Sequence, residues 1–338
     1  MTEPPDARRE PESGAQAPPF VQGAPAPTGA RAVHPYAKVA LYLVGYFVVA
    51  LVLSLVLAVA GGILAGLGVF EPPPLDPGLA TLDMENLIDF VAPYLLPLAI
   101  LTGLYTLAYT WAFMRVFDRR PIRSLGLWLR AGWLSDFAKG AGLAILILAI
   151  IFAFSLVTGS IRVEGLARPA PEATNAAAYL LGAIVAFFLV GLYEEVMFRG
   201  YVLQKTAERA GRIPAIIVSA VLFAVLHGAN PGADAFGIFN TTIIGVLLSV
   251  LYFRTRSLWM PVGFHFAWNF FLGYVYSLPV SGLPIHGLLN VTEVDPESRL
   301  SGGSYGPEAG LACTIALAAW GVWLIWRRTG RGARAGRR

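Results

Sequence analysis

The chain has 338 residues, of which 56% are hydrophobic and only 14% are charged, and its formal net charge is +4. Because a soluble globular domain carries about 25% charged residues, this composition excludes an ordinary soluble protein and predicts a polytopic membrane protein. A single cysteine, Cys313, excludes a disulfide framework and a cysteine-based zinc site, and its apolar neighbours indicate a buried side chain. The positive charges lie in loops and tails without interleaved aromatic residues. We therefore expect them to orient the chain in a membrane and not to bind nucleic acid.

Residues 1–35 are rich in Pro, Ala and Gly and have no apolar periodic face, so we expect a disordered cytoplasmic tail. Eight apolar stretches follow, at 38–66, 86–114, 137–158, 176–198, 213–228, 236–253, 258–278 and 310–326. Most reach the length of about 20 residues that a helix needs to cross a bilayer, and they lack the alternation of barrel strands. The sequence predicts an all-α fold, a bundle of about eight transmembrane helices within 36–328, followed by a basic cytoplasmic tail at 329–338.

Lysine and arginine residues concentrate in alternate loops. The connection at 115–139 contains six of them, whereas 67–85 and 229–235 contain none. The turns after the fourth and sixth apolar segments contain Lys205, Arg209, Arg212, Arg254 and Arg256. Because positively charged loops stay on the cytoplasmic side, we predict a protein of the cell inner membrane with both termini in the cytoplasm.

Polar side chains interrupt three of the apolar segments. An ionisable group there needs a partner, a proton or a function, because burying a charge in a membrane is costly. The polar residues are Glu194, Glu195 and Arg199 in the fourth segment, His227 in the fifth, and His265 and Asn269 in the seventh. At a rise of about 1.5 Å per residue, Glu194 and His227 lie at similar distances from the turn between their helices, and His265 lies at a comparable depth. We expect one polar layer inside the membrane, reachable from the cytoplasmic side.

Helix geometry assigns the two glutamates to different faces. Glu194 and Glu195 are about 100° apart around the helix axis, so both cannot point into one small site. Glu195 and Arg199 are four residues apart, which favours an ion pair, although such a pair is also a common structural clamp. Glu194 is then free to face His227, and a carboxylate in such a pocket suits a general base.

His265 and Asn269 are likewise four residues apart and form a natural pair of donors for a developing oxyanion. On its own, an intramembrane His or Asn is also explained by hydrogen bonds that hold helices together. The arrival of two histidines and an unpaired glutamate at one depth favours a functional site over that explanation.

Three short motifs on separate apolar segments carry a resemblance to a known family. They are Glu194-Glu195-Val-Met-Phe-Arg199, Phe223-Ala-Val-Leu-His227 and His265-Phe-Ala-Trp-Asn269. Their types, order and spacing resemble those of the CAAX-processing and bacteriocin-protection (CPBP or Abi) intramembrane proteases. The match covers about 176–278, which is the motif core of the membrane domain at 36–328.

The resemblance implies an intramembrane endopeptidase similar to the eukaryotic Ras-converting CAAX protease. By that resemblance, Glu194 and His227 hold and activate the attacking water, and His265 and Asn269 stabilise the tetrahedral oxyanion. The residues that set the geometry or pack the wall of the site are Glu195, Arg199 and Phe223. We expect a peptide or membrane-protein substrate and contact with the lipid bilayer, and nothing in the sequence indicates an oligomer.

Whether the site holds a metal is open at this point. The family was first described as metalloproteases, and Glu194, His227 and His265 would satisfy a catalytic zinc ion. The chain has no His-Glu-x-x-His helix, however, and a glutamate-activated water accounts better for Asn269 and for the pairing of Arg199. We favour catalysis without a cofactor and keep zinc as the alternative.

Two other functions remain open. One is a non-proteolytic membrane scaffold or bacteriocin-immunity factor that retains the site residues. The other is a proton-coupled transporter, because intramembrane Glu and His also form proton relays. Clustering of the polar groups in one layer argues against a relay across the membrane. The composition, rich in Arg, Ala, Gly and Pro, is bacterial in style.

Overall fold

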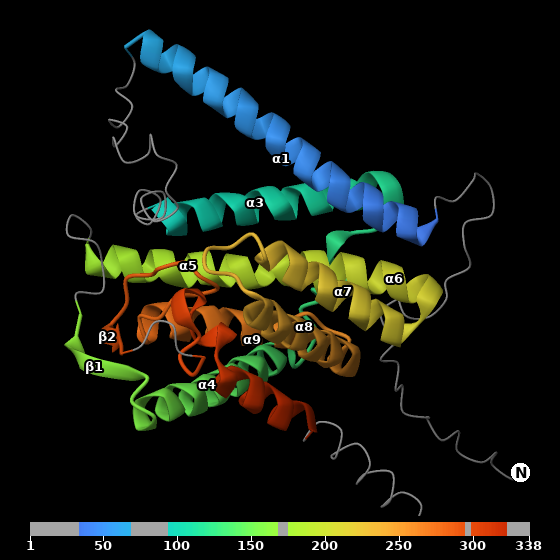
Figure 1. Ribbon diagram of the computed structural model, residues 1–338. Coiled ribbons are helices and arrows are strands. Elements are labelled where there is room, and N and C mark those ends of the chain that lie inside the picture. The colour runs from blue at the N-terminus through green and yellow to red at the C-terminus, as the bar shows by residue number, and fades with distance from the viewer. Residues whose placement is uncertain (1–33, 69–93, 168–174, 295–298, 323–338) are drawn as a thin grey trace, which may run out of the picture.

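The computed structural model describes residues 34–68, 94–167, 175–294 and 299–322 (Figure 1). The predicted tails lie outside the described residues, apart from His34 and Pro35, and so does most of the connection between the first two apolar segments. The predictions of a disordered cytoplasmic tail at residues 1–35 and a basic cytoplasmic tail at 329–338 therefore stay predictions.

Helices dominate the described chain, as predicted. They are α1 (Pro35–Gly66), α3 (Leu95–Phe113), α4 (Trp133–Val157), α5 (Ala176–Glu195), α6 (Leu203–Ala210), α7 (Arg212–His227), α8 (Ala235–Thr255), α9 (Trp259–Asn269) and a final helix at Leu311–Val322. Within the described ranges, five helical spans are long and apolar enough to cross a membrane, and the apolar helices α7 and Leu311–Val322 are shorter. The all-α, polytopic membrane fold is confirmed.

Three of these helices continue into π-helical turns. Met114–Asp118 follows α3, Val196–Val202 follows α5, and Phe270–Val275 follows α9. A π-turn accommodates an extra residue in a helix and is frequent at functional sites. The predicted seventh segment, 258–278, is therefore an α-helix only as far as Asn269.

α5 runs through the middle of the bundle (Figure 1). It packs against α3 on one side and α9 on the other, while α4 covers α9 and α7 pairs with α8. α1 lies obliquely on the outside, and none of its most apolar window is buried. Such an apolar, unburied helix fits a lipid environment.

The backbones of α4 and α9 touch where two glycines face the opposite helix. A Cβ atom on Gly140 would overlap the carbonyl oxygen of Met260, and a Cβ atom on Gly263 would overlap that of Phe137. Small residues allow this close approach between membrane helices. The crossing positions the part of α9 that carries His265.

We predict that Gly263→Ala or Gly140→Ala destabilises the protein by about 1–3 kcal/mol, because the added methyl group forces two backbones apart. The measurement is denaturant unfolding in detergent. Gly142→Ala is the matched control, since a Cβ atom on Gly142 meets nothing within 4 Å. Equal stability of all three variants would show that the crossing is not close in solution.

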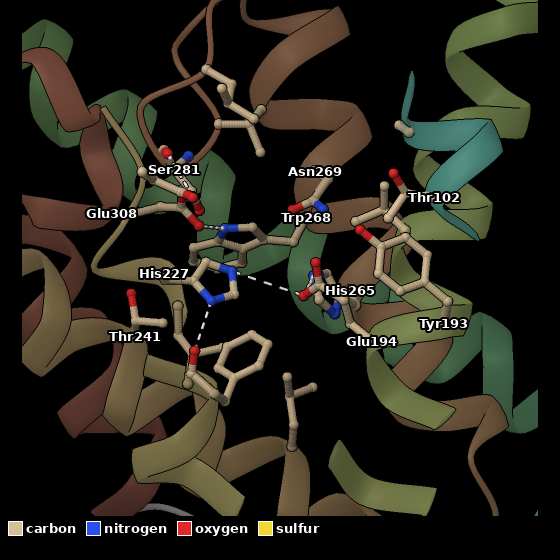
Figure 2. A pocket seen from close by; sticks show the side chains of 18 of the residues that line it. Thr102, Tyr193, Glu194, His227, Thr241, His265, Trp268, Asn269, Ser281 and Glu308 are labelled. Atoms are coloured by element: carbon tan, nitrogen blue, oxygen red, sulfur yellow. Dashed lines mark hydrogen bonds and ion pairs between the residues drawn. The ribbon is translucent and has the colours of Figure 1, made fainter. Parts of the chain in front are cut away.

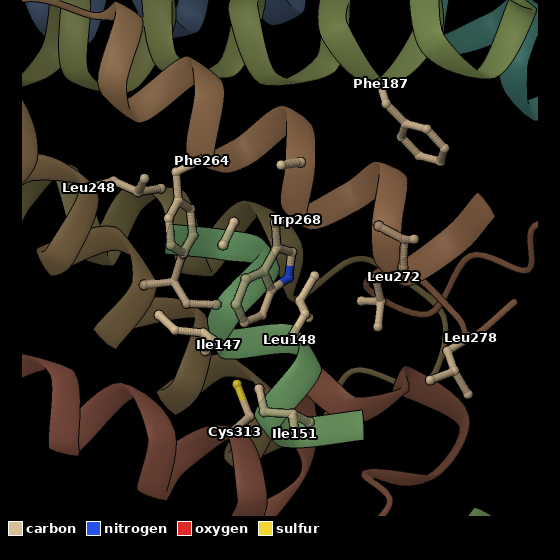
Figure 3. Packing of buried hydrophobic residues seen from close by; sticks show 14 of the residues in the cluster. Ile147, Leu148, Ile151, Phe187, Leu248, Phe264, Trp268, Leu272, Leu278 and Cys313 are labelled. Atoms are coloured by element: carbon tan, nitrogen blue, oxygen red, sulfur yellow. The ribbon is translucent and has the colours of Figure 1, made fainter. Parts of the chain in front are cut away.

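Buried hydrophobic side chains hold α9 against α4 and the final helix (Figure 3). Phe264 stacks on Trp268 and on Trp320, with ring centroids 5.5 Å apart in both pairs. Leu148 is 1% exposed in the same cluster, and Cys313 is fully buried, as predicted. This packing makes α9 a rigid support for the side chains on its other face.

Two short strands, which the sequence pattern does not predict, join two loops. β1 (Ile161–Leu166) pairs antiparallel with β2 (Leu289–Glu293), with Ile161 opposite Glu293 and Leu166 opposite Leu289. The strands are 123 or more positions apart in the chain, so only the packing of the helices brings them together. Burial raises the pKa of Glu293 to about 7.

The bundle has two chemically different ends. The end with the α6–α7 turn, the α8–α9 turn and the residues after α3 is called the basic end here. The other, with β1, β2, the start of α3 and the α7–α8 loop, is called the sheet end (Figure 1). At the basic end, Asp118 Oδ1 lies 2.8 Å from the ammonium groups of both Lys38 and Lys205, and Tyr201 donates to Asp118 Oδ2. This cluster ties α1, α3 and α6 together.

Candidate active site

Four of the predicted polar residues, Glu194, Glu195, Arg199 and Asn269, lie where two helices change from α to π geometry. α5 ends at Glu195, and Arg199 lies in the π-turn that follows. α9 ends at Asn269, directly before its own π-turn. The changed helical phase alters which side chains face inward at these positions.

Glu195 and Arg199 form the predicted ion pair, and both side chains are fully buried. Arg199 Nη1 donates to Glu195 Oε1 at 2.9 Å, and Nη2 donates to the carbonyl oxygen of Gly245 in α8 at 3.2 Å. The guanidinium carbon also lies 4.3 Å from the centroid of the Phe223 ring. A buried charge needs such partners because it has lost its hydration.

His265 connects the two glutamates. Its Nδ1 lies 3.0 Å from Glu195 Oε1, and its Nε2 lies 3.7 Å from Glu194 Oε2. The sequence predicts different environments for the two carboxylates, and the structure confirms this separation. It adds that one imidazole ring lies between them.

Glu194 faces His227, as the helix geometry predicts (Figure 2). The Glu194 Oε2 atom lies 3.8 Å from His227 Nε2, and each side chain is 15% exposed. Glu194 Oε2 is buried and has no hydrogen-bond partner among the described residues. A buried carboxylate oxygen with no donor is poised to accept a hydrogen bond from a molecule in the cavity.

The ring nitrogens of both histidines can be assigned from their partners. His227 Nδ1 lies 2.8 Å from the carbonyl oxygen of Phe223, and His265 Nδ1 faces the carboxylate of Glu195. Because carbonyl and ionised carboxylate oxygens only accept, each Nδ1 carries a proton. In the neutral ring, Nε2 of His227 then presents a lone pair to the same space as Glu194 Oε2.

These groups line a cavity of about 300 Å³. Glu194, His227, His265 and Asn269 all contribute to its wall, so the structure brings the four predicted reactive residues together. Phe223 lines it too, and its ring centroid lies 4.4 Å from that of His227. Glu195 and Arg199 lie behind this wall and do not line the cavity. This position fits the geometry-setting role that the resemblance implies for them.

One buried acid in the cavity wall escaped sequence analysis. Glu308 is 6% exposed, and its carboxylate accepts hydrogen bonds from Trp268 Nε1 at 2.9 Å and from Ser281 Oγ at 2.8 Å. Asn240 in α8 donates to the Glu308 carbonyl oxygen at 2.8 Å. No local signal distinguishes Glu308 from an exposed loop acid in the sequence, because its partners come from three distant segments.

We predict that Glu308→Ala disorders the loop around Ser281 and destabilises the protein by about 1–3 kcal/mol, because it leaves buried donors without acceptors. Glu308→Gln keeps one acceptor oxygen and is expected to lose less. Hydrogen exchange of the amides at 280–283 checks this. Glu208→Ala, at the basic end, is the control. Unchanged exchange in Glu308→Ala would contradict a role for Glu308 in holding this loop.

Loops of the sheet end form the rim of the cavity. Asn230 donates to the Ser281 carbonyl oxygen at 3.0 Å, which joins the α7–α8 loop to the loop after α9. Asp234 caps α8 by accepting from the Gly237 amide at 2.7 Å, and it pairs with Arg299. Partial burial acts to raise the pKa of Asp234, but the Gly237 amide and Arg299 outweigh it and hold that pKa below its usual range.

The predicted access from the cytoplasmic side stays a prediction. The cavity wall includes Leu95, Asn230, Ser281 and Glu308, which belong to the sheet end or its loops. Helix rise correctly predicts that Glu194, His227 and His265 lie close together. It carries no information about the direction from which a substrate reaches them.

Comparison with known proteins agrees with the geometry. Residues 176–271 match the family model described as "Type II CAAX prenyl endopeptidase Rce1-like". This segment is Rce1-like. The resemblance predicted from the three motifs is confirmed over these residues. The Rce1-like segment includes α5, α7, α8 and α9 as far as Asn269, and so contains every predicted reactive residue.

A bacterial protein extends the comparison. "Putative membrane peptidase YdiL" of Bacillus subtilis (strain 168) is 28% identical over 131 residues, which are 37% of this chain and 51% of that protein. The chain thus matches about half the length of this curated relative. Together with the apolar helices, the Rce1-like segment identifies an integral membrane protein.

Proposed function

We propose that this protein is an intramembrane endopeptidase of the CAAX-protease type, which hydrolyses peptide bonds with a water activated by Glu194 and His227. One observation carries the proposal: two acceptor atoms, Glu194 Oε2 and His227 Nε2, lie 3.8 Å apart in a cavity wall. Two facing acceptors repel unless a donor lies between them. A water molecule has two hydrogens and can donate to both.

In the proposed reaction, this water attacks the carbonyl carbon of the scissile bond while its proton passes to Glu194 or His227. A new C–O bond forms, and the carbonyl π electrons move to its oxygen. When this tetrahedral species collapses, the C–N bond breaks and the leaving nitrogen takes the proton. The products are a carboxyl and an amino terminus, so atoms and charge balance.

The developing oxyanion is stabilised by His265 and Asn269 in this proposal. His265 donates from Nε2 when its ring is doubly protonated, and the Glu195 carboxylate at Nδ1 offsets that charge. Asn269 is 6% exposed and lines the same cavity one helical turn further along. Arg199 binds the same Glu195 oxygen from the other side, so this carboxylate lies between two cationic side chains when His265 is doubly protonated.

Zinc is the alternative activator. Glu194, His227 and His265 would hold the ion, which when bound supplies Lewis-acid activation of the water. Their oxygen–nitrogen separations of 3.7 and 3.8 Å exceed the edge of a zinc tetrahedron, about 3.3 Å for bonds of about 2.0–2.1 Å. Among the described residues, no group of three or more His, Cys, Asp or Glu side chains is arranged to hold a metal ion. The proposal therefore uses the water and these side chains alone.

The test is peptide cleavage by the purified protein in detergent, with a membrane-peptide library read by mass spectrometry. We expect new termini with the wild type and none with His227→Ala. Cleavage that survives dialysis against a chelator supports the metal-free form, and loss restored by zinc supports the metal form. New termini in equal amounts from both proteins would contradict the proposed role of His227. No new termini from the wild type would contradict the protease proposal and favour a scaffold or immunity factor.

A further inference from the structure

We infer that the site opens to the extracytoplasmic face of the membrane, so that its substrates are polypeptide segments presented on that face. The substrate half of this inference rests on the proposed peptidase function. The direction of access does not, because it follows from the cavity, the packing and the distribution of charge.

The cavity faces the sheet end. Its wall includes Leu95 and Leu98 in the first turn of α3, and His227 at the last position of α7. It continues onto the loops through Asn230 and Ser281. α3 and α8 begin, and α7 ends, on the sheet-end side of the cavity.

Tightly packed side chains close the route from the basic end. Val196, Phe198 and Tyr201 follow the glutamates in the π-turn and are 0–3% exposed. Leu125 and Leu258, both fully buried, press against Gly200, where an added Cβ atom would lie 3.2–3.4 Å from their side chains. This layer belongs to one buried apolar cluster, and it separates Glu194 from the basic loops. A closed apolar layer of this kind is a barrier to a polar peptide.

The positive charges lie on the closed side. Of the fifteen Lys and Arg residues in the described ranges, Arg199 is buried beside the site, and only Arg162 and Arg299 lie at the sheet end. The twelve at the basic end are Lys38, Arg115, Arg119, Arg120, Arg123, Arg130, Lys139, Lys205, Arg209, Arg212, Arg254 and Arg256. The sequence of the connection at 69–93, which joins α1 to α3, contains no Lys or Arg.

Such an asymmetry orients a polytopic protein, because loops rich in Lys and Arg are retained in the cytoplasm. The basic end is then cytoplasmic and the sheet end extracytoplasmic. Because the cavity opens at the sheet end, a substrate reaches Glu194 from outside the cytoplasm. Cytoplasmic peptide ends, including lipidated ones, would meet the closed apolar layer instead.

The cavity wall adds a chemical preference. Leu95, Leu98, Val280 and Leu283 supply apolar surface around the reactive groups, and the lining contains no Lys or Arg among the described residues. The substrate class is therefore an extended segment of a secreted or membrane-anchored polypeptide with apolar residues near the cleaved bond. Such a segment leaves the hydrated side of the membrane and enters the cavity.

Single-cysteine labelling tests the direction of access without measuring activity. Cys313 is the chain's one cysteine and is fully buried, so Cys313→Ala provides the background. Three reporters are added to it singly: Ala229→Cys at the sheet end, Thr102→Cys in the cavity wall and Ala131→Cys at the basic end. All three residues are exposed. Right-side-out spheroplasts are treated with a membrane-impermeant maleimide before and after permeabilisation.

We expect Ala229→Cys and Thr102→Cys to react in intact spheroplasts and Ala131→Cys to react only after permeabilisation. The reverse pattern would overturn the orientation. Reaction of Thr102→Cys only after permeabilisation, or never, would overturn the open cavity even if Ala229→Cys reacts outside. The three variants carry matched small-to-cysteine changes, so differences in labelling report position.

Cleavage of an impermeant quenched peptide by intact spheroplasts separates this inference from the proposed function. Cleavage outside with the wild type, lost in His227→Ala, supports both. Outside labelling without any cleavage would contradict the peptidase while supporting the direction of access. Cleavage only after permeabilisation would contradict the direction of access while supporting the peptidase.

Discussion

Replacement of Glu194 by glutamine is expected to lower kcat/KM for peptide cleavage by about 10²–10⁴-fold. Glutamine has the same shape but cannot take a proton from the water. Its amide would also offer a donor where the structure has only acceptors, since both Glu194 Oε2 and His227 Nε2 face the cavity. The loss should appear in kcat more than in KM, because the carboxylate acts on the water in the transition state.

The stability of the Glu194→Gln variant should remain close to that of the wild type. Glu194 is not the partner of Arg199, and its Oε2 atom accepts no hydrogen bond from the described residues. Glu208→Gln is a matched control on the same continuous helical span, where the carboxylate pairs with Lys205 at the basic end. A Glu194→Gln variant that cleaves at the wild-type rate would exclude Glu194 as the base.

Replacement of Arg199 by methionine is expected to destabilise the protein by about 3–5 kcal/mol. The change leaves the fully buried Glu195 carboxylate without its counter-ion and removes the hydrogen bond to Gly245 in α8. It also removes the stacked guanidinium from the face of Phe223. Denaturant unfolding of the detergent-solubilised protein measures the loss.

A double-variant cycle separates the ion pair from simple loss of packing. Glu195→Gln combined with Arg199→Met removes both charges, so it should be more stable than Arg199→Met alone. Arg209→Met, at an exposed position on α6, is the surface control. If the double variant loses the sum of the two single losses, the buried charges are not coupled and the pairing is wrong.

The two predictions also distinguish the side chains that face the cavity from those buried behind its wall. Glu194→Gln should reduce activity with little effect on stability, whereas Arg199→Met should reduce stability first. The difference follows from contacts: Glu194 faces the cavity, and Arg199 is enclosed by α5, α8 and Phe223. A uniform loss of both properties in both variants would argue for a structural cluster without chemistry.

Much of the site could be predicted from local spacing. The i, i+4 relation of Glu195 and Arg199 predicts a contact within one helix, and the structure has it at 2.9 Å. The approach of Glu194 to His227 needed only the length of two helices joined by a short turn. The contact of His265 Nδ1 with Glu195 was not predicted, because it depends on how far α9 is rotated against α5.

The hydrogen bonds between loops at the rim of the cavity could not be predicted from the sequence. Glu308 and Ser281 lie in loops, and their hydrogen bond depends on the position of Trp268 in a third segment. The strands β1 and β2 likewise form because helices bring two loops together. Each of these contacts joins residues far apart in the chain, so neither periodicity nor a short motif contains the information.

The sequence by itself determined the helical membrane fold of this protein and the polar residues of its candidate site. Apolar runs of bilayer length require helices, and polar groups within them must be paired or used, because a membrane provides no water to solvate them. The direction of access that we infer depends on tertiary structure alone. The reason is packing: Leu125 and Leu258 press against Gly200 in the π-turn after α5 on one side, while hydrogen-bonded loops border the cavity on the other.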